Sequence, residues 1–253
     1  MIEWLNSYAP LDIVLIARNF DRFLLGVWVT LQLTFLALLF GGLLAVPLAV
    51  ARASRGWASA PVWAFTYLFR GTPLLVQTYL LYYGLGQFEW VRESWAWDPV
   101  LSSAWWCALI AFTLNTAAYQ TELLRGAIDN TPRGEVEAAV AAGYSKRARL
   151  RHIVLPGAFR RAIPAYSNEV IFMLHGSVVA STITIQDILG VGRWLNGRYY
   201  LAYEGFVTAA VLYLLIVMAL AAVFRAIEHR YLAHLRPRDA QAAPVKGMAA
   251  LRV

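Results

Sequence analysis

Five polar side chains lie within long apolar stretches of the sequence, where they could handle a charged solute. Glu169, Asn168 and His175 share one stretch, and Asn115 and Tyr119 share another. Carboxylates inside a membrane span are rare and usually face a protein interior or a water-filled path. Glu169 could therefore attract a cationic solute, or it could pair with a neighbouring helix or lie near the membrane boundary. For the other four side chains, hydrogen bonding between helices is the simpler interpretation, and contact with a solute is the alternative.

A second group of residues predicts a short, slender helix in a polar loop. Thr131 is a candidate N-cap, Pro132 suits the first helical position, and a glycine can end the helix about three turns later. Small side chains allow close backbone approach, so the helix could dock in a groove of a partner protein. An ordinary helical linker is the alternative. The residues that would make the contact are Glu137, Ala138, Ala139 and Gly143.

The composition places both groups in a membrane protein. Of the 253 residues, 60% are hydrophobic and 15% are charged, and the mean hydropathy is +0.53. One soluble core of this size cannot hide so much apolar surface. The composition also excludes a disordered or collagen-like chain, and a single cysteine, Cys107, excludes a disulfide scaffold. We therefore expect an all-α integral membrane protein.

The uncharged stretches predict five transmembrane helices. A guanidinium at the middle of the bilayer costs about 2.5 kcal/mol or more, so Arg70 is expected at the membrane interface, with Trp57–Phe69 as an interfacial segment before it. The expected spans are residues 23–51, 71–88, 99–121, 162–186 and 205–224.

Three local expectations accompany these spans. Thr72-Pro73 lacks one backbone donor and is expected to bend or to start the second span. Glu122 closes the third span and is expected to pair with Arg125 or with a basic residue of the loop that follows. The segments 87–99 and 186–204 are expected to be aromatic-rich loops on the outer side, as interfacial anchors or as a surface for a binding protein.

The basic residues predict the orientation. Of the 22 lysines and arginines, 16 fall in the first loop, the loop at 125–161 and the C-terminal region, which alternate with more acidic segments. The positive-inside rule then places the N-terminus outside and the C-terminus in the cytoplasm. Residues 1–22 become a periplasmic segment and residues 236–253 a cytoplasmic, disordered tail. The net charge of +7 thus reflects topology, and nucleic acid is not an expected partner.

The cytoplasmic loop carries a motif with a known spacing. Glu137-Ala138-Ala139, three residues, Gly143, nine residues and then Ile153–Pro156 resembles the EAA motif of membrane subunits of binding-protein-dependent ABC importers. Three further segments resemble the polar amino acid uptake branch of that family, and the similarity covers about 23–235. Within the branch, the sequence is most similar to the M-type permeases of histidine and lysine/arginine/ornithine importers, with octopine and nopaline permeases as near relatives. The three segments are Arg70–Leu74, Asn115–Tyr119 and Ala165–Glu169.

The resemblance implies a function and a set of partners. It implies a type I ABC importer permease domain over 23–235 that imports polar, basic amino acids or opine-like solutes by alternating access through a bacterial inner membrane. Two permease subunits, often similar paralogues, would form the pore with two ATPase subunits and a periplasmic solute-binding protein. Glu137, Ala138, Ala139 and Gly143 would form the coupling helix that docks into the ATPase.

This chain is not expected to be an enzyme. It contains no G-x-x-x-x-G-K-[ST] phosphate-binding motif, so ATP and Mg²⁺ would act through the partner ATPase, and no cofactor or metal is expected in this chain. A self-contained secondary carrier or channel subunit is the alternative function, and the matched EAA spacing argues against it. A membrane-embedded enzyme is a third hypothesis, but the sequence offers no convincing nucleophile–base set.

Overall fold

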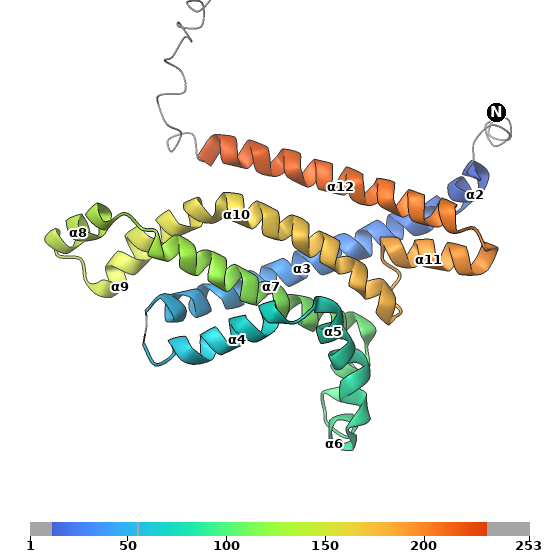
Figure 1. Ribbon diagram of the computed structural model, residues 1–253, viewed down its shortest axis with the longest axis horizontal. Coiled ribbons are helices and arrows are strands. Elements are labelled where there is room, and N and C mark those ends of the chain that lie inside the picture. Colours follow the sequence, from blue (N-terminus) through green and yellow to red (C-terminus); the bar gives the residue numbers. More distant parts are fainter. Residues whose placement is uncertain (1–11, 55, 232–253) are drawn as a thin grey trace, which may run out of the picture.

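The computed structural model describes residues 12–54 and 56–231, and every regular element in these ranges is helical. The long helices run side by side along one direction, while the segment around α5 and α6 projects away from them (Figure 1). In chain order the elements are α2 (Ile13–Arg18), α3 (Phe20–Ala53), α4 (Ser59–Gly71), α5 (Leu74–Tyr79), η1 (Leu80–Gly84), η2 (Leu85–Gln87), α6 (Glu89–Arg92), η3 (Trp97–Leu101), α7 (Ala104–Asp129), α8 (Arg133–Ala141), α9 (Lys146–Arg149), η4 (Leu150–Val154), α10 (Leu155–Gly176), η5 (Ser177–Ile183), α11 (Ile188–Tyr199) and α12 (Ala202–Tyr231).

The predicted all-helical class is confirmed for the described residues. Three stretches are long and apolar enough to cross a membrane: Phe20–Ala53, Lys146–Tyr199 and Ala202–Arg230. The first and last of them contain the expected first and last spans. Helix α7 covers most of the expected third span, starts at Ala104 and continues to Asp129. The count of five spans stays a prediction.

The centre of the bundle is the contact between α3 and α7, with α10 packed against α7. Small residues bring α3 and α7 close together: a Cβ atom at Gly41 would lie only 2.5 Å from Cγ2 of Thr116. Helix α12 is much less buried than α3: 6% of its most apolar 18-residue stretch is buried, against 39% of the corresponding stretch in α3. The buried core residues are Leu33, Ala37, Leu38, Ala108, Leu109, Ala111, Phe112, Val170, Met173, Ala180 and Ile183.

The segment expected before the second span is part of the bundle, because helix α4 packs against α3 and α7. The depth of Arg70 in the membrane stays a prediction. Arg70 lies near the C-terminal end of α4, about 16 Å along the helix from Ser59. The break expected at Thr72-Pro73 is found: α4 ends at Gly71 and α5 begins at Leu74, because proline lacks an N–H group and forces the preceding residue out of helical geometry.

A second difference concerns the loop expected between Gln186 and Glu204. The structure forms helix α11 there, and this helix packs between α12 and α3. Asp187 begins the helix, because its carboxylate accepts a hydrogen bond of 2.7 Å from the amide of Gly190. Gly192 and Gly205 allow the close approach of α11 and α12. The aromatic residues of this segment suggested a loop, whereas the cap and the glycines predict a packed helix.

Two sequence expectations fall partly or wholly outside the described residues. Of the N-terminal segment 1–22, residues 1–11 are not described, while α2 and the start of α3 occupy the rest. The tail expected at 236–253 lies entirely outside the described ranges.

Candidate functional site

The break between α4 and α5 gathers polar side chains inside the bundle. The Asn115 amide on α7 donates hydrogen bonds to the carbonyl of Phe69, at 3.2 Å, and to Oε1 of Gln77, at 3.1 Å. The Tyr119 hydroxyl donates to the carbonyl of Arg70 at 3.4 Å. The Arg70 guanidinium carbon lies 5.2 Å from the centre of the Tyr119 ring, within the range of a cation–π contact. Helix α7 therefore holds the end of α4 and places an arginine beside a tyrosine.

Glu169 lies on the side of α10 that faces α7. Its side chain is buried, and its carboxylate accepts a hydrogen bond of 2.7 Å from Oγ1 of Thr116. Gln120 in turn donates to Oγ1 of Thr116 at 3.1 Å and to the carbonyl of Leu38 at 3.3 Å. This chain of bonds ties α10, α7 and α3 together. Arg70 is the opposite charge that acts on the Glu169 carboxylate.

The structure brings three of the five expected solute-path residues together and leaves two apart. Asn115 and Tyr119 bond to the end of α4, and Glu169 is linked to them through Thr116 on α7 and through the charge of Arg70. Asn168 and His175 are exposed on α10, and neither makes a side-chain hydrogen bond with this group in the described part of the chain. His175 lies about 9 Å along the helix from Glu169. The two exposed residues therefore line a different part of the surface.

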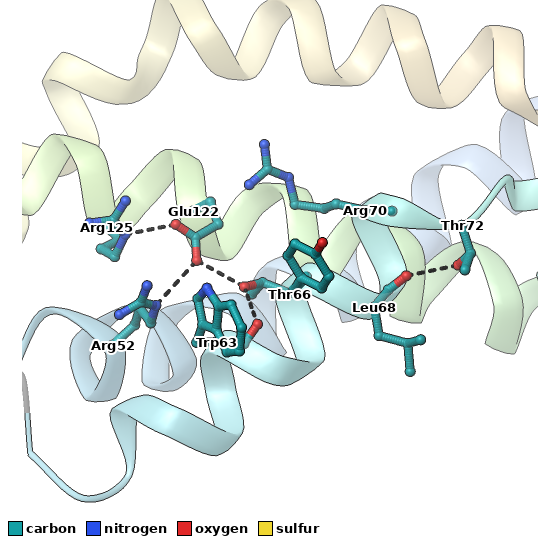
Figure 2. A pocket seen from close by; sticks show the side chains of 10 residues that line it. Arg52, Trp63, Thr66, Leu68, Arg70, Thr72, Glu122 and Arg125 are labelled. Carbon is teal, nitrogen blue, oxygen red and sulfur yellow. Dashed lines mark hydrogen bonds and ion pairs between the residues drawn. The ribbon is translucent and has the colours of Figure 1, made fainter.

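A cavity of about 590 Å³ opens between α3, α4 and α7 (Figure 2). Three arginines and one glutamate line it together with aromatic and small polar residues. Because the positive charges outnumber the carboxylate, the cavity suits a ligand with an anionic group. Its lining consists of Arg52, Trp63, Thr66, Tyr67, Leu68, Arg70, Gly71, Thr72, Glu122 and Arg125.

Glu122 joins the three helices around this cavity. Its carboxylate accepts hydrogen bonds from Nε of Arg125, at 2.7 Å, and from Oγ1 of Thr66, at 2.9 Å. It also lies 3.4 Å from Nε of Arg52, as the dashed lines in Figure 2 show. The contact with Arg125 confirms the pairing expected from the sequence, and the contact with Arg52 extends it to α3.

The charges around Glu122, just beyond the expected third span, decide its ionisation. Burial raises the pKa of this carboxyl, but the hydrogen bonds from Arg125 and Thr66 and the positive charges of Arg125 and Arg52 lower it by more. The pKa therefore lies below its ordinary value. The carboxylate is charged at neutral pH and holds α3, α4 and α7 together as an anion.

Sequence reasoning missed one residue of this site, Gln77, and gave Arg70 no part in the solute path. Arg70 was assigned to the membrane interface because a guanidinium inside a bilayer is costly. The break expected at Thr72-Pro73 contained the signal for Gln77, since a helix break inside an apolar stretch leaves unpaired carbonyls that other polar groups must satisfy.

The loop that resembles the EAA motif forms the expected helix. Helix α8 spans Arg133–Ala141. Two residues later Gly143 turns the chain with left-handed backbone geometry, at φ 79°. Two hydrogen bonds close this end, from the amide of Gly143 to the carbonyl of Val140 and from the amide of Tyr144 to the carbonyl of Ala139, both at 3.0 Å. The predicted glycine cap is thus confirmed.

The expected N-cap of this helix is wrong. The Thr131 hydroxyl donates to the carbonyl of Ile128 at 2.7 Å and accepts from Nη2 of Arg161 at 2.8 Å, so it is not available to cap α8. Arg161 also donates to the carbonyl of Ala127. The end of α7 and the start of α10 are thereby fastened together, and α8 projects beyond them. On α8, Glu137 and Ala138 are exposed and Ala139 is buried.

Known proteins share this sequence over most of its length. The histidine/lysine/arginine/ornithine transport system permease protein HisM of Escherichia coli K12 is 45% identical over 213 residues, which cover 84% of this chain and 90% of HisM. The octopine transport system permease protein OccM of Rhizobium radiobacter is 42% identical over 220 residues, which cover 87% of this chain and 89% of OccM.

Solved structures share the fold. A chain of an amino acid ABC transporter crystallised with histidines matches with a TM-score of 0.78 and 27% identity, covering 88% of this chain and 100% of that one. A chain of the inward-facing MetNI methionine ABC transporter matches with a TM-score of 0.69 and 19% identity, covering 85% and 98%, which shows the fold alone. The family described as "binding-protein-dependent transport system inner membrane component" matches residues 16–233. This chain belongs to that family.

Proposed function

We propose that this chain is a transmembrane permease subunit of an ATP-driven ABC importer for basic amino acids or related opines, in a bacterial inner membrane. The observation that carries the proposal is the identity of 45% to HisM over 84% of the chain. The named substrates of HisM are histidine, lysine, arginine and ornithine, and three of these carry a cationic side chain at neutral pH.

Five spans in the predicted orientation fit the arrangement of the helices. In this proposal α4 and α5–η2 form one broken span, and α3, α7, α10 and α12 form the other four, within a permease domain at 23–235. Helices α8 and α9 lie at the end of the bundle where α3 ends, and α2 and α11 lie at the opposite end (Figure 1). The arginine-rich loop and Arg52 thus share one end, which the positive-inside rule assigns to the cytoplasm.

A cationic amino acid fits the charges around the break. The Arg70 guanidinium offers a partner for the α-carboxylate, and the Glu169 carboxylate offers one for the cationic side chain. Tyr119 and Asn115 hold the end of α4 from the other side. Asn168 and His175, which are exposed on α10, would line an adjoining part of the solute path.

The exposed surfaces support the proposed partners. The helix α8 with its Gly143 cap is proposed to dock into an ATPase subunit through exposed Glu137 and Ala138, with buried Ala139 behind them, and that subunit binds ATP and Mg²⁺ and does the hydrolysis. The largely unburied apolar α12 is available for the bilayer and for a second permease subunit. A periplasmic binding protein would deliver the solute. The permease chain itself has no catalytic role and needs no nucleic acid.

The proposal is tested by reconstituting the complex. The chain is co-expressed with a second permease and an ATPase from the same genomic neighbourhood, and the complex is placed in vesicles with the binding protein outside. We expect uptake of labelled arginine that requires ATP inside. Uptake against a gradient by this chain alone would overturn the proposal and favour a self-contained carrier.

A further inference from the structure

The break between α4 and α5 leaves a backbone carbonyl without its helical partner. In an uninterrupted helix the amide of residue 73 would bond to the carbonyl of Phe69, but residue 73 is proline and has no N–H group. Thr72 is extended, with φ −112° and ψ 140°, and Pro73 follows with φ −62° and ψ 137°. Within a membrane-spanning segment, such a carbonyl is costly unless another donor reaches it.

The side chain of Gln77 supplies that donor. Nε2 of Gln77 lies 2.8 Å from the carbonyl oxygen of Phe69, 3.0 Å from that of Thr72 and 2.7 Å from Oγ1 of Thr72. An amide NH₂ has two hydrogens, so it serves two of these oxygens at a time. The side chain is 8% exposed, and its Oε1 accepts from Asn115, which also bonds to Phe69.

These bonds hold the residues on both sides of Arg70. Phe69 is fixed immediately before it and Thr72 two positions after it, so Gln77 closes a loop around Gly71, Arg70 and their neighbours. Oγ1 of Thr72 also donates to the carbonyl of Leu68 at 2.9 Å, which closes the preceding turn. Figure 2 shows the Arg70 side chain extending from this closed end of α4 on the side of Glu122, in the cavity that Tyr67 also lines.

Arg70 depends on this fixed backbone for its direction. Its guanidinium makes no ion pair within the described part of the chain; it lies 5.2 Å from the centre of the Tyr119 ring and interacts with the charge of Glu169. Because no ion pair fixes the guanidinium, its direction depends on the backbone at residue 70. That backbone is held by a residue that does not line the cavity itself.

We propose that Gln77 is a positioning residue for solute binding: its side-chain amide fixes the helix break so that the Arg70 guanidinium is presented to the carboxylate of the transported amino acid. The assignment rests on the proposed function, because it takes a solute carboxylate as the partner of Arg70. A role in stability alone would require only that the freed carbonyls be satisfied, and would not couple residue 77 to residue 70.

The first experiment measures this coupling in the complete permease–ATPase complex. Binding of labelled arginine is measured by equilibrium dialysis, without the binding protein, for Gln77→Met, Arg70→Gln and the double variant. Methionine keeps the size of glutamine and removes its donors. We expect each single variant to weaken binding about tenfold, as for loss of one hydrogen bond to a charged group, and the double variant to bind no more weakly than Arg70→Gln.

The matched control is the neighbouring residue on the same helix. Thr78 is fully buried, and its hydroxyl bonds only to the carbonyl of Leu74 one turn earlier. Thr78→Val should bind arginine as the wild type does. Effects of Gln77→Met and Arg70→Gln that multiply to about a hundredfold would show independent action and would overturn the proposal.

The second experiment reports on residue 70 without any solute. The single cysteine, Cys107, is buried and is replaced by alanine, and a cysteine is introduced at residue 70 or, as a control, at Tyr67 on the same cavity wall. We expect Gln77→Met to slow maleimide labelling at residue 70 and leave it unchanged at residue 67. If Gln77→Met does not assemble, Thr72→Val, which removes one of the three acceptors, should change labelling in the same direction.

The two experiments separate the two proposals. A wild-type complex that binds no arginine would overturn the proposed solute class, and the labelling rates would still decide whether Gln77 orients residue 70. Equal labelling at residue 70 with and without Gln77 would overturn the positioning role, even if arginine binds to the wild type.

Discussion

The break between α4 and α5 and the end of α8 both contain backbone that departs from helical geometry, and they satisfy its polar groups in opposite ways. At the break, proline removes a donor and the side chains of Gln77 and Asn115 replace it. At the end of α8, Gly143 turns the chain, and the backbone amides of Gly143 and Tyr144 make the closing bonds themselves. The helix break uses side chains as donors, whereas the end of α8 uses backbone amides and leaves its side chains available for other contacts.

This difference follows from the surroundings of the two sites. Inside the bundle Gln77 and Asn115 are buried, and the carbonyls that they reach need protein donors, so other helices must bring these polar side chains there. Outside the bundle water is available, and a slim helix with small exposed residues is well suited to contact another protein. The break between α4 and α5 is therefore suited to select a solute by charge, while the end of α8 is suited to recognise a partner by shape.

The largest expected effect comes from changing Gly143, which turns the chain at the end of α8. Gly143 has φ 79°, which L side chains rarely adopt, and a carboxylate there would also enter the proposed ATPase interface. We expect Gly143→Asp to insert and assemble but to lose ATP-driven uptake almost completely while ATP hydrolysis continues. Uptake and ATPase activity are measured in the same vesicles.

The matched control for this prediction is a second glycine at the start of the same helix. Gly134 has open space around it and no positive φ, so Gly134→Ala should transport normally. Normal uptake by Gly143→Asp would count against the docking role of α8.

The next prediction removes the negative charge of Glu169 and keeps the shape of its side chain. In Glu169→Gln the side chain can still accept the Thr116 hydrogen bond, but the negative charge is gone. If Glu169 attracts the cationic end of the solute, uptake of arginine should fall about tenfold and selectivity for arginine over glutamine should fall with it. Competition between labelled arginine and unlabelled glutamine measures both changes.

The control for Glu169 is a carboxylate on α12. Glu228 makes a weaker contact, 3.4 Å from Oγ of Ser167, and Glu228→Gln should leave selectivity unchanged. Unchanged uptake and selectivity in Glu169→Gln would instead leave Glu169 with a structural role between α10 and α7.

The smallest expected effect concerns the stability that Glu122 contributes at the cavity between α3, α4 and α7. Glu122→Gln weakens the contacts with Arg52 and Arg125, and partly exposed ion pairs of this kind contribute about 0.5–1 kcal/mol. We expect the melting temperature of the purified complex to fall by a few degrees. Asp129→Asn, which breaks only the more exposed pair with Arg125, should change it less.

The pH dependence of this effect has a definite sign. Because the folded-state pKa of Glu122 lies below its ordinary value of 4.5, the charged group stabilises the fold at higher pH, and this contribution disappears as pH falls through the folded pKa. The difference in melting temperature between wild type and Glu122→Gln should be constant near neutral pH and shrink below about pH 4.5. A difference that grows on acidification would contradict the ion-pair account.

Local patterns allowed correct predictions where one segment contains the whole signal. The apolar stretch around α3, the helix of α8 and its cap at Gly143 depend on residues within a few turns of each other. The pair of Glu122 and Arg125 is of the same kind, since residues three apart lie on one face of a helix. These features needed no knowledge of the rest of the chain.

Predictions failed where contacts with a distant segment determine which local structure is the most stable. Local sequence patterns did not indicate that Arg70 would lie beside the Tyr119 ring and line a polar cavity. Thr131 was expected to cap α8, but Arg161, 30 residues later, occupies its hydroxyl. Helix α11 was expected as a loop, although its contacts with α3 and α12 favour a packed helix.

The sequence by itself determined that this is an all-helical membrane protein with a loop that resembles the EAA motif, because composition, hydropathy and motif spacing are properties of the linear chain. Only the tertiary structure decided that Gln77, Asn115 and Tyr119 meet at the end of α4 and that Arg70 lies among them. The physical reason is that a break in a buried helix is stable only when donors arrive from other segments, and their positions depend on how the helices pack.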